Sequence, residues 1–208
     1  MLLRIHPGNP DLRQLTKALE VLRDGGVIIY PTDGVYAFGC DATKQRAVER
    51  VARLKGIKPE KADFSLVFSD LSHLADYTRA VDTRTFKLMK TCLPGAYTFI
   101  LNANANVPKL FRNNKKTIGI RIPDNNICRE LARELGNPLI SSSVHDQDEI
   151  VEYTTDPSLI HERYEEMVDL VIDGGFGLNI PSTVIDCTGS EPVLIRRGAG
   201  EVDLLDED

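Results

Sequence analysis

The sequence lacks any apolar run of about 18 residues, the length that a membrane-spanning helix requires. It also lacks a charged N-terminal region followed by a long apolar core, so residues 1–14 do not have the pattern of a secretory signal. We therefore expect a soluble, cytoplasmic protein with no membrane partner.

Sequence features that usually separate domains are also missing. No internal repeat, low-complexity tract or linker rich in Gly, Pro or Ser interrupts the 208 residues. A chain of this length can bury a substantial core of its own as one large domain. We predict a single domain over residues 1–208, with only the acidic end at residues 203–208 loosely held.

Cysteine is scarce, and its spacing excludes two kinds of structure. The four cysteines lie far apart and form no CxxC pair: Cys40, Cys92, Cys128 and Cys187. This spacing argues against a disulfide framework and against a zinc knuckle. We predict that all four are buried thiols, because free cysteine packs as a small apolar residue.

Several motifs of catalytic sites are absent as well. There is no GxxxxGK[ST] loop and no GxGxxG, so a phosphate would not be held in the Walker or Rossmann manner. The four histidines show no HxxxH or HxH spacing, which predicts no protein-bound catalytic metal. Residues 141–143 are three serines without the GxSxG elbow, which argues against a serine hydrolase.

The charge that is present is distributed unevenly. Residues 1–121 carry 20 Lys and Arg against 11 Asp and Glu, a net of +9. Residues 122–208 carry 5 against 20, a net of −15. Because phosphate contacts need a basic surface, the N-terminal part is the candidate for an anionic ligand. Alternatively, the two halves attract each other within one fold.

Apolar spacing predicts a mixture of helices and strands. Leu12, Leu15, Leu19 and Leu22 recur at helical spacing before Asp24-Gly25-Gly26, which predicts a helix over 11–23. Further helices are expected at 44–54, 83–91, 126–135 and 157–167. Short β-rich runs predict strands at 27–32, 64–68, 97–102, 117–122, 139–143, 170–173, 182–186 and 193–196, with a loop over 32–42.

The interleaving of these elements predicts an α/β fold, a sheet with helices packed on it. Connections of mixed length argue against a purely parallel sheet. The glycine-rich stretch at residues 173–177 is interpreted as a turn that follows a strand.

Hydroxylated and basic residues gather at the predicted strand ends, where open sheets usually bind ligands. We expect residues 31–42 (PTDGVYAFGCDA) to line such a site, and five cations follow closely: Arg50, Arg53, Lys55, Lys58 and Lys61. Arg121 ends another strand, and its guanidinium must find a carboxylate or a phosphate. Ser182-Thr183 and Arg196-Arg197 repeat the pattern near the C-terminus.

Seven segments follow one another along the chain in this order: PTDGVYAFGCDA, LKGIKP, LPGAYTFIL, TIGIRIPDN, PLISSS, STVID and LIRRGAG. Through these segments the chain resembles the YrdC/YciO family over residues 15–200. The chain is most similar to the YciO branch, because Gly34 replaces the second threonine of PTDT and Ile57 replaces a basic residue. The SAN-x-SG signature reads Ser143-Val144-His145-Asp146-Gln147-Asp148 here.

The resemblance implies a twisted, open mixed sheet with a large basic concave face. It implies binding of ATP, with Mg²⁺ as its substrate complex, or of double-stranded RNA. In the catalytic members it implies synthesis of threonylcarbamoyl-AMP from threonine, bicarbonate and ATP, for the threonylcarbamoyladenosine modification of tRNA.

The resemblance also implies a role for each matching residue. Thr32 and Tyr36 would contact threonine, and Arg121 its carboxylate. The nucleotide and its phosphates would be held by Lys55, Lys58, Ser141, Ser143, Ser182 and Arg196. The remaining cations, Arg50, Arg53 and Lys61, are candidates for RNA contacts.

Three functions stay open from the sequence. The first is the synthase, a nucleotidyltransferase. The second is a paralogue that binds double-stranded RNA or tRNA without synthesis, favoured by the basic N-terminal part and by the altered segment after Ser143. The third is a hydrolase or transferase acting on a related ligand, with His145 as acid or base.

Overall fold

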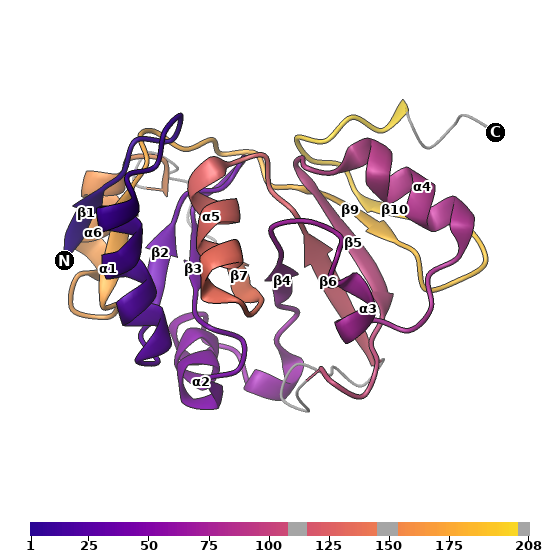
Figure 1. Ribbon diagram of the computed structural model, residues 1–208, viewed down its shortest axis with the longest axis horizontal. Helices are drawn as coiled ribbons and strands as arrows, with labels where there is room; N and C mark the ends of the chain where they lie inside the picture. Colours follow the sequence, from indigo (N-terminus) through magenta and orange to yellow (C-terminus); the bar gives the residue numbers. More distant parts are fainter. Residues whose placement is uncertain (108–115, 145–153, 204–208) are drawn as a thin grey trace.

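A computed structural model describes residues 1–107, 116–144 and 154–203 of the chain (Figure 1). In its first half the elements are β1 (Leu2–Arg4), α1 (Leu12–Arg23), β2 (Ile28–Tyr30), β3 (Ala37–Gly39), α2 (Gln45–Leu54), the 3₁₀ turn η1 (Pro59–Lys61), β4 (Ser65–Val67), α3 (Leu74–Tyr77) and α4 (Thr83–Cys92). The second half contains β5 (Tyr97–Asn102), β6 (Thr117–Arg121), α5 (Asn126–Leu135), β7 (Leu139–Ser143), α6 (Pro157–Tyr164), β8 (Leu170–Asp173), β9 (Thr183–Asp186) and β10 (Val193–Arg196).

Side-chain caps fix where the longer helices begin. Asp11 accepts a hydrogen bond from the Gln14 amide ahead of α1, and Asn125 accepts one from the Cys128 amide ahead of α5. Each cap satisfies an amide that the first helical turn leaves unpaired. Helix α5 ends at Gly136, whose φ of 73° is left-handed and easily adopted only by glycine.

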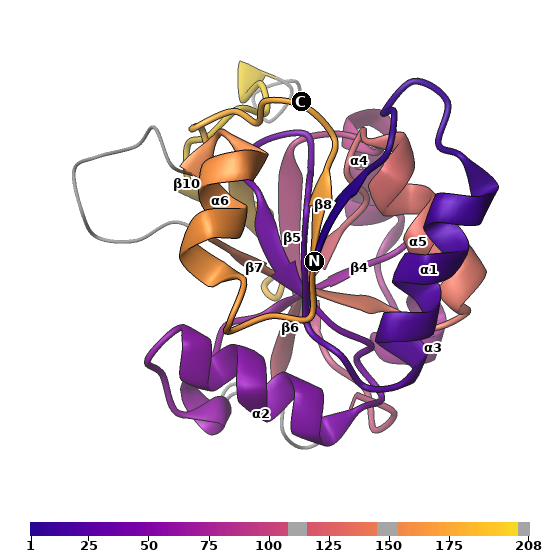
Figure 2. The same ribbon diagram turned by 90° about the vertical axis from the view of Figure 1, so that its left-hand side faces the viewer.

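The strands form one ten-stranded sheet in the order β1-β8-β2-β3-β7-β4-β6-β5-β9-β10. Pairs β4·β6 and β5·β9 are parallel, whereas β4·β7 and β5·β6 are antiparallel, so the sheet is mixed. Its strands fan out when the sheet is viewed from one end (Figure 2), as the twist of an open sheet requires. The predicted mixed α/β sheet with helices packed on it is therefore confirmed.

Two hydrophobic clusters lie on opposite faces of this sheet. Helices α2, α3, α4 and α6 contribute to the larger cluster, and α1 and α5 to the smaller one. Figure 2 shows α1 and α5 on one side of the sheet and α2 and α6 on the other. The pattern follows the pleat, because Leu66 of β4 belongs to the first cluster and its neighbour Val67 to the second.

The face that carries α1 and α5 divides into two halves. We call the part under these helices the covered half; its apolar side chains include Ile28, Tyr30, Ala37, Val67 and Leu139. The same face continues over β6, β5, β9 and β10, and we call this part the open half. None of the described helices contributes a residue to a hydrophobic cluster with that part of the face.

Most predicted elements are observed, and the strands at 97–102, 139–143, 170–173 and 193–196 and the helix at 126–135 have the predicted bounds. The loop predicted over residues 32–42 is wrong in its middle. Strand β3 forms there because Ala37, Phe38 and Gly39 pair with both β2 and β7. The stretch has no alternating pattern, since all three residues are buried between neighbouring strands.

Three short elements were not predicted from the sequence, and helix α6 is shorter than predicted. Strand β1, the 3₁₀ turn η1 and helix α3 contain three, three and four residues, too few to show a period. Helix α6 ends at Tyr164 rather than at residue 167. Across the described ranges, none of the helices is both long and apolar enough to cross a membrane.

Candidate functional site

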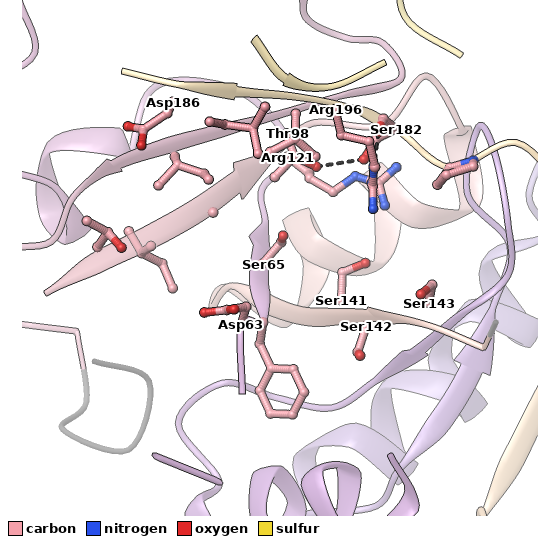
Figure 3. Close-up of a pocket in the computed structure, with 18 of the residues that line it drawn as sticks. Asp63, Ser65, Thr98, Arg121, Ser141, Ser142, Ser143, Ser182, Asp186 and Arg196 are labelled. Carbon is pink, nitrogen blue, oxygen red and sulfur yellow. Dashed lines mark hydrogen bonds between the residues drawn. The ribbon is translucent and has the colours of Figure 1, made fainter. Parts of the chain in front are cut away.

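A cavity of about 590 Å³ lies over the open half and reaches β4 and β7 (Figure 3). Its volume lies within the range that small ligands occupy in proteins. Its apolar lining consists of Val35, Ala62, Phe64, Ile100, Ile118, Pro181, Val184 and Ile195. The rest is Gly119 and a polar set: Asp63, Ser65, Thr98, Asn102, Thr117, Arg121, Ser141, Ser142, Ser143, Ser182, Asp186, Thr188 and Arg196.

Strand pairing brings the polar side chains of this pocket together. Ser65 of β4 pairs with Gly119 of β6 on one side and with Ser141 of β7 on the other. Because paired residues point to the same face, these three positions form one row on the pocket side. A Cβ atom on Gly119 would lie 2.7 Å from Ser65 Oγ, so glycine leaves the floor of the pocket open.

Arg121 is the buried cation of the pocket. Its side chain is 9% exposed, and its Nη2 donates to Asp33 Oδ1 at 3.0 Å. Asp33 Oδ2 accepts a second hydrogen bond from the Asp124 amide at 2.9 Å, which fixes the carboxylate. Arg121 Nε is buried and has no hydrogen-bond partner among the described residues. The carboxylate that Arg121 was predicted to need is thus Asp33, and this one bond leaves other guanidinium donors for a ligand.

A second guanidinium stands beside it. Arg196 donates from Nη2 to the Ser182 carbonyl at 2.9 Å, and Ser182 Oγ lies 2.8 Å from Thr98 Oγ1 (Figure 3). Partial burial, and secondarily the positive charge of Arg121, lower the pKa of Arg196. Two neighbouring cations repel each other, so an anion bound between them would be stabilised by both.

Lys55 reaches the same region from the opposite side of the sheet. It is the C-cap residue of α2, and its Nζ donates to the Ser143 carbonyl at 2.8 Å. The contact places its charge behind the last residue of β7, whose carbonyl belongs to the pocket wall. Lys55 itself is not part of the lining.

Thr32 shapes the loop before the pocket. Its Oγ1 donates to the Val35 carbonyl at 2.8 Å and accepts from the Gly34 amide at 3.1 Å. These bonds hold the turn that presents Asp33 to Arg121. Of the whole segment 31–42, Val35 alone lines the pocket. The contribution of the segment to the pocket is therefore mainly indirect.

Tyr36 points away from the pocket to the strap, our name for residues 174–181 between β8 and β9. Its hydroxyl donates to the Gly175 carbonyl at 2.7 Å and accepts from the Gly174 amide at 3.2 Å. Burial raises the pKa of Tyr36 well above its ordinary value. The turn predicted at residues 173–177 is observed, since the Gly175 amide bonds to Asp173 Oδ1.

The strap crosses directly over Gly34. The Leu178 amide donates to the Gly34 carbonyl at 2.9 Å, and a Cβ on Gly34 would lie 2.8 Å from the Ile180 carbonyl oxygen. Gly177 likewise lies against the ring of Tyr36. Glycine at position 34 is thus a packing requirement here, where the resemblance alone showed only a missing hydroxyl.

The remaining predicted cations lie outside the lining. Arg50 forms an ion pair with Asp169 at 2.6 Å and donates to the Met167 carbonyl, so its charge is partly neutralised. Arg53 is exposed two residues before Lys55, and Lys58 and Lys61 are exposed between Lys55 and the pocket residue Ala62. His145 and the acidic residues that follow lie outside the described residues, as does the C-terminal end from residue 204.

The sequence interpretation missed half of the pocket floor. Thr98, Gly119 and Asp186 were not singled out, although they lie in strands that were predicted. Alternation within β5 would have placed Thr98, Ile100 and Asn102 on the same face of that strand. Alternation within β9 would have done the same for Val184 and Asp186. What was missing was the pairing of β5 with β9, which are 80 residues apart in the chain.

The four cysteines are buried and free, as predicted. Burial raises the pKa of the Cys40, Cys128 and Cys187 thiols, so none is poised as a nucleophile. Among the described residues, no group of three or more His, Cys, Asp or Glu side chains is arranged to hold a metal ion.

Comparisons with known proteins converge on one family. The sequence model of the Sua5, YciO and YrdC proteins, described as telomere recombination, matches residues 20–198. YciO of Escherichia coli is 44% identical over 200 residues, which cover 95% of each chain. A threonylcarbamoyl-AMP synthase of Nitrosococcus oceani is 34% identical over 128 residues, 62% of this chain and 69% of the relative.

Solved structures have the same fold. The crystal structure of E. coli YciO matches with a TM-score of 0.91 at 42% identity, over 99% of this chain and 98% of that one. P. abyssi Sua5, solved in complex with L-threonine, matches with a TM-score of 0.86 at 24% identity. That match covers 95% of this chain and 57% of the other, and at this identity it supports the fold alone.

Proposed function

Because the chain belongs to the Sua5/YciO/YrdC family, we propose that its pocket binds ATP and L-threonine and converts them, with bicarbonate, to threonylcarbamoyl-AMP and pyrophosphate. Relatives named threonylcarbamoyl-AMP synthase support this choice of ligands, and a Sua5 protein of the same fold was solved with L-threonine. The product would serve the threonylcarbamoyladenosine modification of tRNA.

The buried guanidinium of Arg121 carries the proposal. Its Nε faces no acceptor among the described residues, and Arg196 adds a second positive charge nearby. A buried donor without a partner is costly, and a carboxylate or phosphate would satisfy it. Threonine and ATP supply both groups. Asp33 keeps Arg121 in place, so the site is arranged before the ligand arrives.

The proposed reaction needs charge neutralisation and positioning from the protein. The threonine amine and bicarbonate form a carbamate and water; a carbamate oxygen then attacks the α-phosphorus of ATP, and the bond to the β-phosphate breaks to release pyrophosphate. Arg121 and Arg196 would offset the gathered negative charge, and the hydroxyls of Ser141 and Ser182 would orient the phosphates. Mg²⁺ would enter bound to ATP and shield its phosphates.

Pyrophosphate release from ATP by the pure protein tests this function. We expect release to require both threonine and bicarbonate, and Arg196→Ala to lower it by roughly 10- to 100-fold, the worth of a charged hydrogen bond. Arg129→Ala is the matched control, because Arg129 pairs with Asp124 and Asn126 away from the pocket. Release that ignores threonine and bicarbonate would refute the synthase.

Binding of double-stranded RNA or tRNA without synthesis is the second candidate. The exposed cations Arg53, Lys58 and Lys61 favour it, because they flank Lys55 in the segment that leads to Ala62 at the pocket. Replacing all three with Ala should weaken binding to an RNA duplex and make its affinity less dependent on salt. An unchanged salt dependence would count against this surface.

A further inference from the structure

The two ends of the pocket differ in charge. Ser182 precedes β9 and Asp186 ends it, four residues or roughly 13 Å apart along the strand. Arg121 and Arg196 mark the positive end, together with Ser182. Asp63 and Asp186 lie toward the other end, and Figure 3 shows both carboxylates on the opposite side from the two guanidiniums.

Asp186 is held in a fixed position at the acidic end. Its Oδ1 accepts two hydrogen bonds from Thr188, one from the amide at 2.9 Å and one from Oγ1 at 2.7 Å. These fill the two lone pairs of Oδ1. Oδ2 has no hydrogen-bond partner among the described residues. Asp186 as a whole is one of the residues that line the pocket. The end therefore offers one oriented acceptor.

An apolar section lies between the two ends. Gly119 leaves its floor open, and Ile100 and Val184 flank it on β5 and β9. Ile195 of β10 also lines the pocket and is 58% exposed, large for an isoleucine on a strand. A flat aromatic group placed here would remove these apolar side chains from water, whereas a chain of phosphates would not. This section of the pocket therefore suits a base rather than a phosphate.

We propose that the nucleotide lies along the strands with its phosphate at Arg121 and Arg196 and its base at Asp186, whose Oδ2 accepts a hydrogen bond from an exocyclic amino group of the base. This inference rests on the proposed nucleotide site and adds its orientation and the residue that selects the base. The spacing of the two ends is comparable with the length of a nucleoside monophosphate.

The chemistry of Asp186 decides which bases fit. An amino group, as on adenine, donates to Oδ2, whereas a carbonyl oxygen at the same place would meet the negative charge and be repelled. The opposite orientation is disfavoured, because a phosphate beside Asp63 and Asp186 would face two carboxylates. Asp186 is thus a specificity-determining residue rather than a catalytic one.

Calorimetric titration with AMP and with purine riboside 5′-monophosphate, which lacks only the amino group, tests the inference. The unmodified protein should bind AMP roughly 10- to 100-fold more tightly, as expected for a hydrogen bond to a charged group. Asp186→Ala should bring this ratio close to one and leave the affinity for purine riboside 5′-monophosphate nearly unchanged.

Two further variants control for folding and for chemistry. Asp70→Ala is matched, because Asp70 accepts from the Ser72 amide two residues on, as Asp186 does from Thr188, but lies outside the pocket. It should keep the preference for AMP. Asp186→Asn retains an acceptor for Thr188 and turns an amide NH₂ toward the base, so it should favour inosine 5′-monophosphate over AMP.

The outcomes separate this inference from the proposed function. If both nucleotides bind equally well and Arg196→Ala weakens both, the base does not lie at Asp186 and only this inference fails. If neither nucleotide binds to the unmodified protein at millimolar concentration, the nucleotide site itself is refuted and the inference with it. A preference for AMP that persists in Asp186→Ala also overturns the assignment of Asp186.

Discussion

The covered and open halves share one face of one sheet, yet their side chains differ in polarity. In the covered half Tyr30, Val67 and Leu139 pack beneath α1 and α5. In the open half the equivalent pleat positions carry small or polar residues such as Thr98 and Gly119 beside the apolar Ile100 and Val184. Backbone pairing is continuous across both halves. The difference therefore comes from what lies on the sheet, a helix layer or the cavity.

The border between the halves runs through single strands. Val67 of β4 belongs to the apolar cluster under α5, whereas Ser65, two residues earlier on the same face, lines the pocket. Leu139 and Ser141 of β7 show the same change within one pleat repeat. A sheet face can thus switch from core to binding site within about 7 Å.

Shortening an apolar side chain in the covered half should have the largest effect. Leu139 is fully buried beneath α5, so Leu139→Ala should lower the free energy of unfolding by about 3 kcal/mol through lost burial and a cavity. Urea denaturation measures this change.

The matched substitution on the pocket side of the border is Ser65→Ala, on the strand next to β7. It removes only a hydroxyl at the pocket wall and should change the free energy of unfolding by less than about 0.5 kcal/mol. Equal losses in the two variants would contradict the division into a covered and an open half.

A smaller effect is expected where the strap links the two halves. The strap leads from β8 in the covered half to β9 in the open half and crosses Gly34. Gly34→Ala would place a Cβ 2.8 Å from the Ile180 carbonyl, a backbone atom that cannot rotate away. We expect a loss of about 1–3 kcal/mol and weaker nucleotide binding, since Pro181 and Ser182 continue into the pocket.

Gly189→Ala provides the control for this prediction. A Cβ at Gly189 would be 3.9 Å from its nearest neighbour, the Glu191 carbonyl, which is ordinary contact. Its free energy of unfolding should stay the same or rise slightly. If the two alanine variants are equally stable, the strap moves freely from Gly34 and does not fix the pocket.

Local patterns were sufficient for much of the covered half. The helix over 11–23 was predicted from leucine spacing, because its apolar stripe faces the sheet, and a helix over 126–135 was also expected. Family motifs brought Arg121, Ser141, Ser143, Ser182 and Arg196 into the predicted site, and the structure places all five around one pocket.

The acidic end of the pocket could not be predicted in this way. Asp186 lies next to Ile185 in an ordinary strand pattern, and its position relative to Arg121 depends on the order β6-β5-β9. Such pairings join distant segments and leave no local signal. The ion pair of Arg121 with Asp33 likewise joins residues 88 positions apart.

The smallest expected effect concerns the residue next to Asp186 on the opposite face. Cys187 belongs to the larger cluster, and burial raises the pKa of its thiol to about 12. Because its pKa is raised in the folded state, the neutral Cys187 thiol stabilises the fold at pH values below the ordinary thiol pKa near 9. This stabilisation is lost as the pH rises toward 12. At pH 8.5 iodoacetamide should therefore label Cys187 at least 100-fold more slowly in the folded protein than in urea, as measured by mass spectrometry. Equal labelling rates would mean that the end of β9 opens readily, and that Asp186 and Cys187 are not held on separate faces.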